Sequence, residues 1–266
     1  MKCLNVIVFY DNREEVSKYI SEVSDISNGM VDMVVVNNRN SRREDLDALC
    51  AGRAKVVDYG ENVGYLNSML KYIRGEGTDR YDYVILSNTD IHYDMKSFFS
   101  RLAEKQYAPD IGCIAPSVFS TKIQNYQNPH YIERIPKEKF ERLVRIFGHP
   151  WLGRLYLKLS EWKATAATAE KKDSRYVYSP NGSYMIFTRD FIAKIRGYEY
   201  GVTLYSEESC VGELLRKHNM KCFYDNSIEV IHQESTVTGK MNYKARFEAW
   251  RTSMEYILRE FYSENS

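Results

Sequence analysis

Short apolar runs alternate with helix-like patterns between residues 4 and 116 of this 266-residue chain. The apolar runs are rich in Val and Ile, which is typical of strands that are buried on both faces. We expect strands at 4–10, 33–36, 54–57, 82–87 and 111–116, and helices between them at 13–27, 44–50, 65–74 and 95–105. This alternation predicts an α/β domain with a doubly wound, mostly parallel sheet.

Polar residues follow several of these runs directly. The run 82–87 is followed by Asn88 and Asp90. Right-handed crossovers would place Asn37, Asn62 and Asp90 along one rim, at the carboxyl ends of the strands, where open α/β sheets bind ligands. A carboxylate there can hold a divalent cation, and the cation can hold a diphosphate. The alternative is that Asp90 caps the helix that follows.

Composition excludes several classes of protein. The formal net charge of +1 argues against a general nucleic-acid binder, which would be clearly basic. The five cysteines are scattered without a C-x-x-C pair, so we expect reduced thiols in a cytoplasmic protein. The N-terminus leads directly into a strand pattern, so no signal peptide is expected. No apolar run approaches the roughly 18 residues of a membrane span.

Glycine-rich phosphate loops are absent from the sequence. The loop 60–65 does not match G-x-G-x-x-G, and no G-x-x-x-x-G-K-[ST] occurs, which argues against dinucleotide dehydrogenases and P-loop enzymes. Sugar nucleotidylyltransferases share the general layout, but a glycine-rich loop is expected directly after their first strand. Here that position, 11–15, contains no glycine.

The second half contains a basic helical segment at about 121–175. Residues 134–163 include eight Lys or Arg and three Glu. Two amphipathic helices are expected on either side of the break at 148–150. Their apolar faces comprise Phe140, Leu143, Val144 and Phe147, and then Trp151, Leu152, Leu155, Tyr156, Leu159 and Trp162. They either lie on an anionic membrane surface or, as most amphipathic helices do, pack on their own domain.

The remaining elements complete one predicted domain. We expect strands at 184–187, 221–224 and 227–231, and helices at 189–195, about 206–218 and 243–262. The predicted organisation is a domain over 1–240 that carries the helical insertion. A C-terminal helix within 241–266 would pack on the same domain.

The order of these features resembles the family 2 glycosyltransferases with the GT-A fold, particularly the rhamnosyltransferase-like group that builds bacterial surface polysaccharides. The resemblance covers about 4–238 and is carried by Val34–Asn38, Glu61–Tyr65, Ile85–Asp90, Asn181–Ser183, Tyr205–Glu208 and Ile231–His232 followed by Ser235. It implies a Rossmann-like GT-A domain. It also implies inverting transfer of a sugar from a UDP-, dTDP- or GDP-sugar to a saccharide or lipid-linked saccharide, in the cytoplasm or peripherally at the inner membrane face.

The same resemblance implies a divalent cation, Mn²⁺ or Mg²⁺. Asn88-Thr89-Asp90 stands where the family has a D-x-D-like step, so Asp90 would ligate the cation that bridges the donor diphosphate. His232 matches a family histidine near the diphosphate, as a ligand of the cation or a donor to phosphate. The alternative for His232 is a strand-end histidine that is satisfied by the backbone.

Two acidic residues match the family's catalytic pair, which is usually Glu-Asp. Glu208 would deprotonate the acceptor hydroxyl, and Glu207 is the second choice for this base. The alternative is that both are favourable charges in the first turn of a helix.

The remaining matches concern the donor. Nucleotide contacts are implied for Tyr10, Asp11, Asn37, Asn62, Asn67 and Asn88, and contacts near the transferred sugar for Asn181 and Gly182. Asn37, Asn88 and Glu208 stand where the family favours Asp. The competing hypothesis is therefore a catalytically inactive protein on the same fold that binds nucleotide sugars or carbohydrate.

Overall fold

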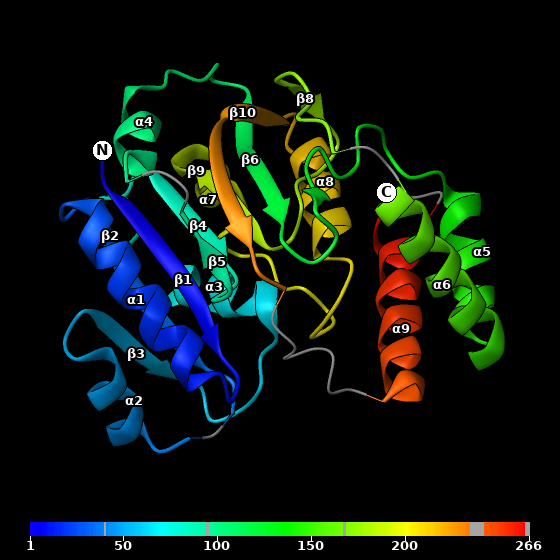
Figure 1. Cartoon of the computed structure of the whole chain (residues 1–266), viewed down its shortest axis with the longest axis horizontal. Coiled ribbons are helices and arrows are strands. Elements are labelled where there is room, and N and C mark those ends of the chain that lie inside the picture. Colours follow the sequence, from blue (N-terminus) through cyan, green and yellow to red (C-terminus); the bar gives the residue numbers. More distant parts are fainter. Residues whose placement is uncertain (40, 94–95, 167–168, 235–241, 264–266) are drawn as a thin grey trace.

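The computed structural model describes residues 1–39, 41–93, 96–166, 169–234 and 242–263, and within them a ten-stranded sheet forms the centre of the molecule (Figure 1). The strands are β1 (Cys3–Phe9), β2 (Val31–Asn37), β3 (Ala54–Asp58), β4 (Tyr83–Ser87), β5 (Ile91–His92), β6 (Ile111–Ser120), β7 (Asn125–Tyr126), β8 (Arg175–Val177), β9 (Tyr184–Thr188) and β10 (Lys221–His232).

The strand order is β3-β2-β1-β4-β9-β6-β10-β5, and β7 and β8 pair with β6 and β10. The first four strands in this order are mutually parallel, and β6 is parallel to β10. The exception in the middle is β9, which is antiparallel to both β4 and β6. The predicted mixed α/β architecture with a mostly parallel sheet is confirmed.

Helices cover both faces of the sheet. They are α1 (Arg13–Ser27), α2 (Arg43–Cys50), α3 (Tyr65–Gly75), α4 (Phe98–Glu104), α5 (Lys137–Phe147), α6 (Pro150–Ala166), α7 (Arg189–Ile195), α8 (Glu207–Lys217) and α9 (Tyr243–Phe261). The apolar sides of α1, α2 and α4 form one core with the sheet, and those of α3, α7 and α8 form the other. Alternate residues of β1 enter opposite cores, Leu4 and Val6 on one face and Ile7 and Phe9 on the other, because strand side chains alternate.

Element boundaries differ from expectation at several places, and the strand expected at 111–116 extends to Ser120 in β6. The runs 221–224 and 227–231 form the single strand β10, whose register with β6 shifts between Asp225 and Glu229. Asp225 accepts hydrogen bonds from the backbone N–H and hydroxyl of Ser227, which stabilises this irregularity. Position 95 of the helix expected at 95–105 lies outside the described residues, and the observed helix α4 spans Phe98–Glu104.

The insertion is only partly helical. Its first part carries β7, whereas α5 and α6 follow and lie beside α9 at one side of the sheet (Figure 1). Leu143 and Phe147 of α5 are buried against Phe247 of α9 in a small separate core. A Cβ at Gly153 of α6 would lie 2.9 Å from the Phe247 ring, so the two helices approach closely there. The expected packing of the α5 face on the protein is therefore observed.

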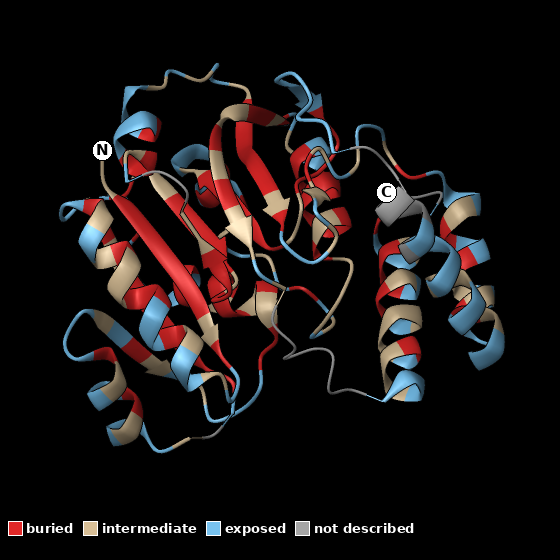
Figure 2. Ribbon diagram, in the orientation of Figure 1, coloured by how far each residue is buried: buried red, intermediate tan, exposed pale blue. Residues whose placement is uncertain are grey.

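The apolar face of α6 is divided. Trp151, Leu155, Leu159 and Trp162 are exposed, whereas Leu152 and Tyr156 are half-buried (Figure 2). No helix in the described parts of the chain is long and apolar enough to cross a bilayer. All five cysteines are buried and unpaired, as expected for reduced thiols.

Candidate active site

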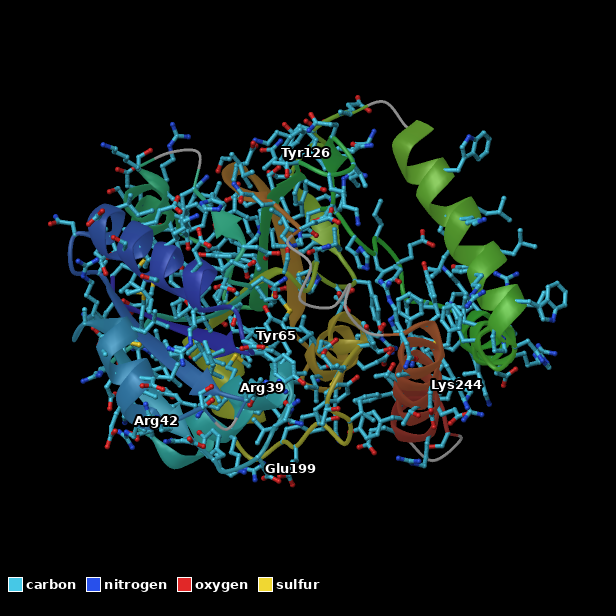
Figure 3. All side chains as sticks on the ribbon, turned by 60° about the horizontal axis from the view of Figure 1, so that its bottom comes forward. Arg39, Arg42, Tyr65, Tyr126, Glu199 and Lys244 are labelled. Carbon is cyan, nitrogen blue, oxygen red and sulfur yellow. The ribbon has the colours of Figure 1, made fainter. Side chains whose placement is uncertain are left out.

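A pocket of about 410 Å³ opens at the carboxyl ends of β1, β2 and β4. The strands β1, β6 and β10 point downward in Figure 1, and Figure 3 turns this lower edge toward the viewer, with Tyr65 labelled near its centre. The lining residues are Val8, Tyr10, Asn12, Glu15, Asn38, Asn62, Gly64, Tyr65, Ser87, Asn88, Thr89, Asp90 and Leu204. The chain reverses its strand order between β1 and β4, so the pocket lies at the topological switch point of the sheet.

The segment Asn88–Asp90 is held by three other parts of the chain. The Asn88 N–H donates to Ser183 O at 2.8 Å, and the Thr89 hydroxyl accepts from Asn12 Nδ2 at 2.6 Å. The Asp90 carbonyl accepts from the Gln233 N–H at 2.9 Å. These bonds fix the place of the Asp90 carboxylate, which is only 8% exposed.

Asp90 and His232 lie side by side although they are far apart in sequence. His232 Nε2 is 3.3 Å from Asp90 Oδ1, and His232 Nδ1 is 2.8 Å from Gln127 Oε1. Gln127 Nε2 donates to Glu234 Oε1 at 2.9 Å. Because a carboxylate only accepts, this bond orients the Gln127 amide so that its oxygen accepts from Nδ1–H of His232. A neutral His232 then presents the lone pair of Nε2 beside the Asp90 carboxylate.

These two side chains fit a divalent cation. A carboxylate oxygen and an imidazole nitrogen are ligands that Mn²⁺ accepts, and oxygen alone suits Mg²⁺. The bond from His232 to Gln127 supplies the outer contact that usually orients a ligating histidine. Among the described residues, no cluster of three or more His, Cys, Asp or Glu is arranged to hold a metal. Diphosphate oxygens and water would therefore complete the coordination shell.

The acidic pair begins α8 directly after two left-handed residues, Tyr205 and Ser206, with φ of 69° and 60°. Glu207 turns inward, is 7% exposed, and its Oε1 accepts from the Tyr205 N–H at 3.0 Å. Burial, with the charge of Glu208 as a second cause, raises the pKa of Glu207 to about 8. Glu208 is half-buried, and its Oε1 accepts from the Gly182 N–H at 3.2 Å.

A chain of contacts connects the two acidic regions. Ser183 accepts from Asn88 through its carbonyl, and its N–H donates to Asn181 Oδ1 at 2.9 Å. Gly182, between them, contacts Glu208. Tyr65 is partly buried and lines the pocket, and its pKa is raised well above the usual value by burial and by the charges of Glu207, Asp90 and Glu208, among others. Asn88 and Glu208 are therefore linked through the Asn181–Ser183 segment, and the charges of Asp90 and the acidic pair both act on Tyr65.

The structure distributes the sequence-predicted residues unevenly. Tyr10, Asn62, Asn88 and Asp90 line the pocket, and His232 contacts Asp90 from beside it. Asn181, Gly182 and Glu208 form an adjoining group through the contacts described above. Asp11 is exposed and does not line the pocket.

Two predicted nucleotide contacts are not supported by the geometry. Asn37 is fully buried, and its Nδ2 donates to Ser41 O and Asp58 Oδ2, both at 2.8 Å. Asn67 Nδ2 donates to Tyr200 O at 2.7 Å, and its Oδ1 accepts from the Tyr200 N–H. Both amides are thus occupied in stabilising neighbouring loops.

Sequence reasoning missed Asn12, Tyr65 and Gln127. Asn12 could have been found because it follows Asp11 directly at the end of the first strand. Tyr65 could have been found because it follows Gly64 in the loop 60–65. No feature of the sequence pointed to Gln127, because its contact with His232 joins residues that are 105 positions apart.

Comparison with known proteins identifies the fold. No family model and no curated protein sequence matches the chain. Among solved structures, the mannosyltransferase PcManGT from Pyrobaculum calidifontis in complex with GDP-Man and Mn²⁺ superposes with a TM-score of 0.56 and 10% identity, covering 92% of this chain and 59% of that one. GalNAc-T7 with UDP, GalNAc and Mn²⁺ superposes with a TM-score of 0.53 and 10% identity, covering 100% of this chain and 57% of that one. The chain has the GT-A glycosyltransferase fold.

A third GT-A structure is similar over most of its own length. It is glucosyl-3-phosphoglycerate synthase from Mycobacterium tuberculosis with Mn²⁺, UDP-Glc and phosphoglyceric acid, with a TM-score of 0.51, 12% identity, and coverage of 97% of this chain and 79% of that one. By contrast, the chain spans less than three fifths of PcManGT and GalNAc-T7. At these identities the likeness establishes the GT-A fold. The rhamnosyltransferase-like group is not identified by it.

Proposed function

We propose that this GT-A protein is a metal-dependent, inverting glycosyltransferase that uses a nucleotide-diphosphate sugar. The observation that carries the proposal is that His232 contacts Asp90 at the carboxyl-terminal rim of the sheet, while Glu208 is linked to Asn88 through the segment that contains Gly182. The fold neighbours support transfer from a nucleotide sugar in general, because their structures contain GDP-Man, UDP or UDP-Glc together with Mn²⁺.

The donor would occupy the pocket between Tyr10 and Asp90. A divalent cation held by Asp90 and His232 would neutralise the diphosphate, whose negative charge grows as it leaves the sugar. Tyr10 is 40% exposed at the mouth of the pocket, with the Arg39 guanidinium 5.5 Å from its ring centre. An exposed aromatic ring here suits stacking on the base, and Asn62 suits polar contacts to the nucleoside.

Glu208 is the residue that we assign as general base. It would take the proton of the acceptor hydroxyl while that oxygen attacks the anomeric carbon from the face opposite the diphosphate. The glycosidic bond to phosphate breaks, and the configuration inverts. Glu207 is less suited, because it is buried, bonded to the backbone of Tyr205 and raised in pKa to about 8.

The acceptor is proposed to be a saccharide or lipid-linked saccharide, in keeping with the resemblance to enzymes of bacterial surface polysaccharide synthesis. The reaction would take place in the cytoplasm. Asn37, Asn88 and Glu208 occupy positions where the family favours Asp, so the competing function is a non-catalytic protein that binds nucleotide sugars or carbohydrate.

Thermal shift and donor hydrolysis separate these functions. We expect one nucleotide class among UDP-, GDP- and dTDP-sugars to raise the unfolding temperature in the presence of Mn²⁺, because ligand binding stabilises the folded state. We also expect slow Mn²⁺-dependent hydrolysis of that donor, which Glu208→Gln abolishes while donor binding persists. Stabilisation without turnover, on any acceptor or on water, would favour the binding protein. Absence of stabilisation by every donor would reject both functions.

A further inference from the structure

We propose that the exposed face of α6 docks the protein on an anionic membrane surface. This face consists of Trp151, Leu155, Leu159 and Trp162, and we call it the α6 stripe. The proposal concerns a surface away from the pocket and does not depend on the protein being a glycosyltransferase.

The α6 stripe is a concentrated apolar surface. Its members are separated by four, four and three residues, so they lie along one side of the helix. Trp151 and Trp162 are 68% and 67% exposed, and Leu155 and Leu159 are 50% and 51% exposed. Among the described residues, eight large hydrophobic side chains are exposed, and this single helix carries four of them. Single exposed hydrophobic residues scattered over a surface would need no explanation, but a continuous hydrophobic patch does.

The opposite side of α6 already has its packing partners. Gly153 lies against Phe247, and the Tyr156 ring lies 5.6 Å from the Phe147 ring. The helix therefore rests on α5 and α9 by one side and lies at the periphery of the molecule (Figure 3), and the α6 stripe is exposed. The stripe is not required to form the local core.

Basic residues border the stripe. Arg154 and Lys158 are exposed, one turn apart, along one edge of it. The Arg154 guanidinium lies 5.0 Å from the ring centre of Tyr243, which is itself 50% exposed. The neighbouring helix α5 also carries two exposed arginines, Arg142 and Arg145.

This combination fits an anionic bilayer better than a protein. Tryptophans are favoured at the headgroup level, and leucines between them can enter the acyl boundary. Lys and Arg beside an interfacial helix attract anionic headgroups, whereas protein interfaces are depleted in Lys. A symmetric contact with a second copy would bring Arg154 and Lys158 near their own counterparts, which opposes self-association.

Binding of the full chain to vesicles tests the proposal. Wild type should bind vesicles of about 30% phosphatidylglycerol in phosphatidylcholine, with a blue shift of tryptophan emission, and bind phosphatidylcholine alone much more weakly. Arg154→Gln with Lys158→Gln should weaken binding about 30-fold, at roughly 5-fold for each charge removed. Trp151→Ala with Trp162→Ala should weaken binding by at least about 10-fold, because each buried indole contributes.

Matched controls lie on other faces. Tyr176→Ala removes an exposed ring that is also paired with a cation, Lys221 at 4.9 Å, and Arg42→Gln with Arg43→Gln removes two exposed charges at the start of α2. Both controls should bind vesicles like wild type, and every variant should keep its unfolding temperature. Failure of wild type to bind anionic vesicles, or equal loss in the controls, overturns the proposal. Dimerisation that requires Trp151 and Trp162, without vesicle binding, would assign the stripe to a second copy instead and also overturn it.

Discussion

The backbone N–H of Gly182 lies 3.2 Å from Oε1 of Glu208, and a Cβ at position 182 would lie 2.6 Å from the same oxygen. Only glycine therefore allows the carboxylate to approach the chain this closely. This contact joins the connection before β9 to the first turn of α8, and so fixes the proposed base relative to the Asn181–Ser183 segment.

Gly182→Ala should displace the Glu208 carboxylate and lower kcat by about 100-fold, since misplacement by about 1 Å costs this much. Donor affinity should change little, because the pocket residues are not moved. Steady-state kinetics with a donor-binding titration measures both quantities. The control is Gly197→Ala, because a Cβ at the exposed Gly197 meets nothing within 4 Å. Equal kcat values for the two variants would remove Glu208 from its proposed position.

Gln127→Leu should weaken Mn²⁺ binding about 10-fold by removing the acceptor that orients His232. Asp90→Asn should weaken it further, because it removes the charged ligand. Calorimetric titration with Mn²⁺ in the presence of nucleoside diphosphate measures the affinity without any turnover. Gln106→Leu, at an exposed position, serves as the control. Unchanged Mn²⁺ affinity in both Asp90→Asn and Gln127→Leu would contradict the proposed cation site.

The sequence predicted the rim because strand ends are visible in a hydrophobic pattern. Asp90 follows the buried run of β4, and its position at the carboxyl edge follows from the strand–helix alternation alone. The same rule places Asn37 at the end of β2, as observed, but it does not reveal what the Asn37 amide contacts. Its amide bonds to Asp58 at the end of the neighbouring strand, 21 residues away, and pattern does not reveal such a partner.

Contacts between residues far apart in the sequence also limited what could be predicted. The periodicity of Tyr184–Thr188 indicates a strand, but its place between β4 and β6 depends on contacts with segments more than 70 residues away. In α6 the apolar residues were recognised, but which of them face outward depends on how α5 and α9 approach the helix. The local hydrophobic pattern therefore predicts that a helix or strand exists more reliably than it predicts which other elements that helix or strand contacts.

Glu207→Gln should change how stability depends on pH. The pKa of Glu207 is raised from 4.5 to about 8 in the folded protein, so between these pH values the unfolded chain has lost a proton that the folded one retains. The free energy of unfolding contributed by Glu207 thus falls as pH rises through this window. Glu207→Gln has no carboxyl at this position, so its free energy of unfolding does not fall for this reason. Relative to wild type, the stability of the variant should therefore increase by at most about 1.4 kcal/mol for each unit by which the pH rises.

Urea denaturation at about pH 5, 6.5 and 8 measures this difference for Glu207→Gln. Glu133→Gln, at an exposed position, should follow the wild-type curve at every pH. If Glu207→Gln and wild type change in parallel, the buried carboxyl does not retain its proton and our preference for Glu208 as base loses its electrostatic support.

Phe247→Ala tests whether the helical insertion and α9 belong to the same folding unit as the sheet. Phe247 is 2% exposed, and Ser253 of the same helix bonds to Ser206 at 2.9 Å, beside the acidic pair. Removing a buried Phe leaves a cavity and should cost about 3–5 kcal/mol of stability. In one unit, circular dichroism and tryptophan fluorescence should show a single transition at lower urea. Tyr243→Ala, at a half-exposed site on α9, should cost little. Loss of the fluorescence transition alone would mean that the insertion unfolds separately.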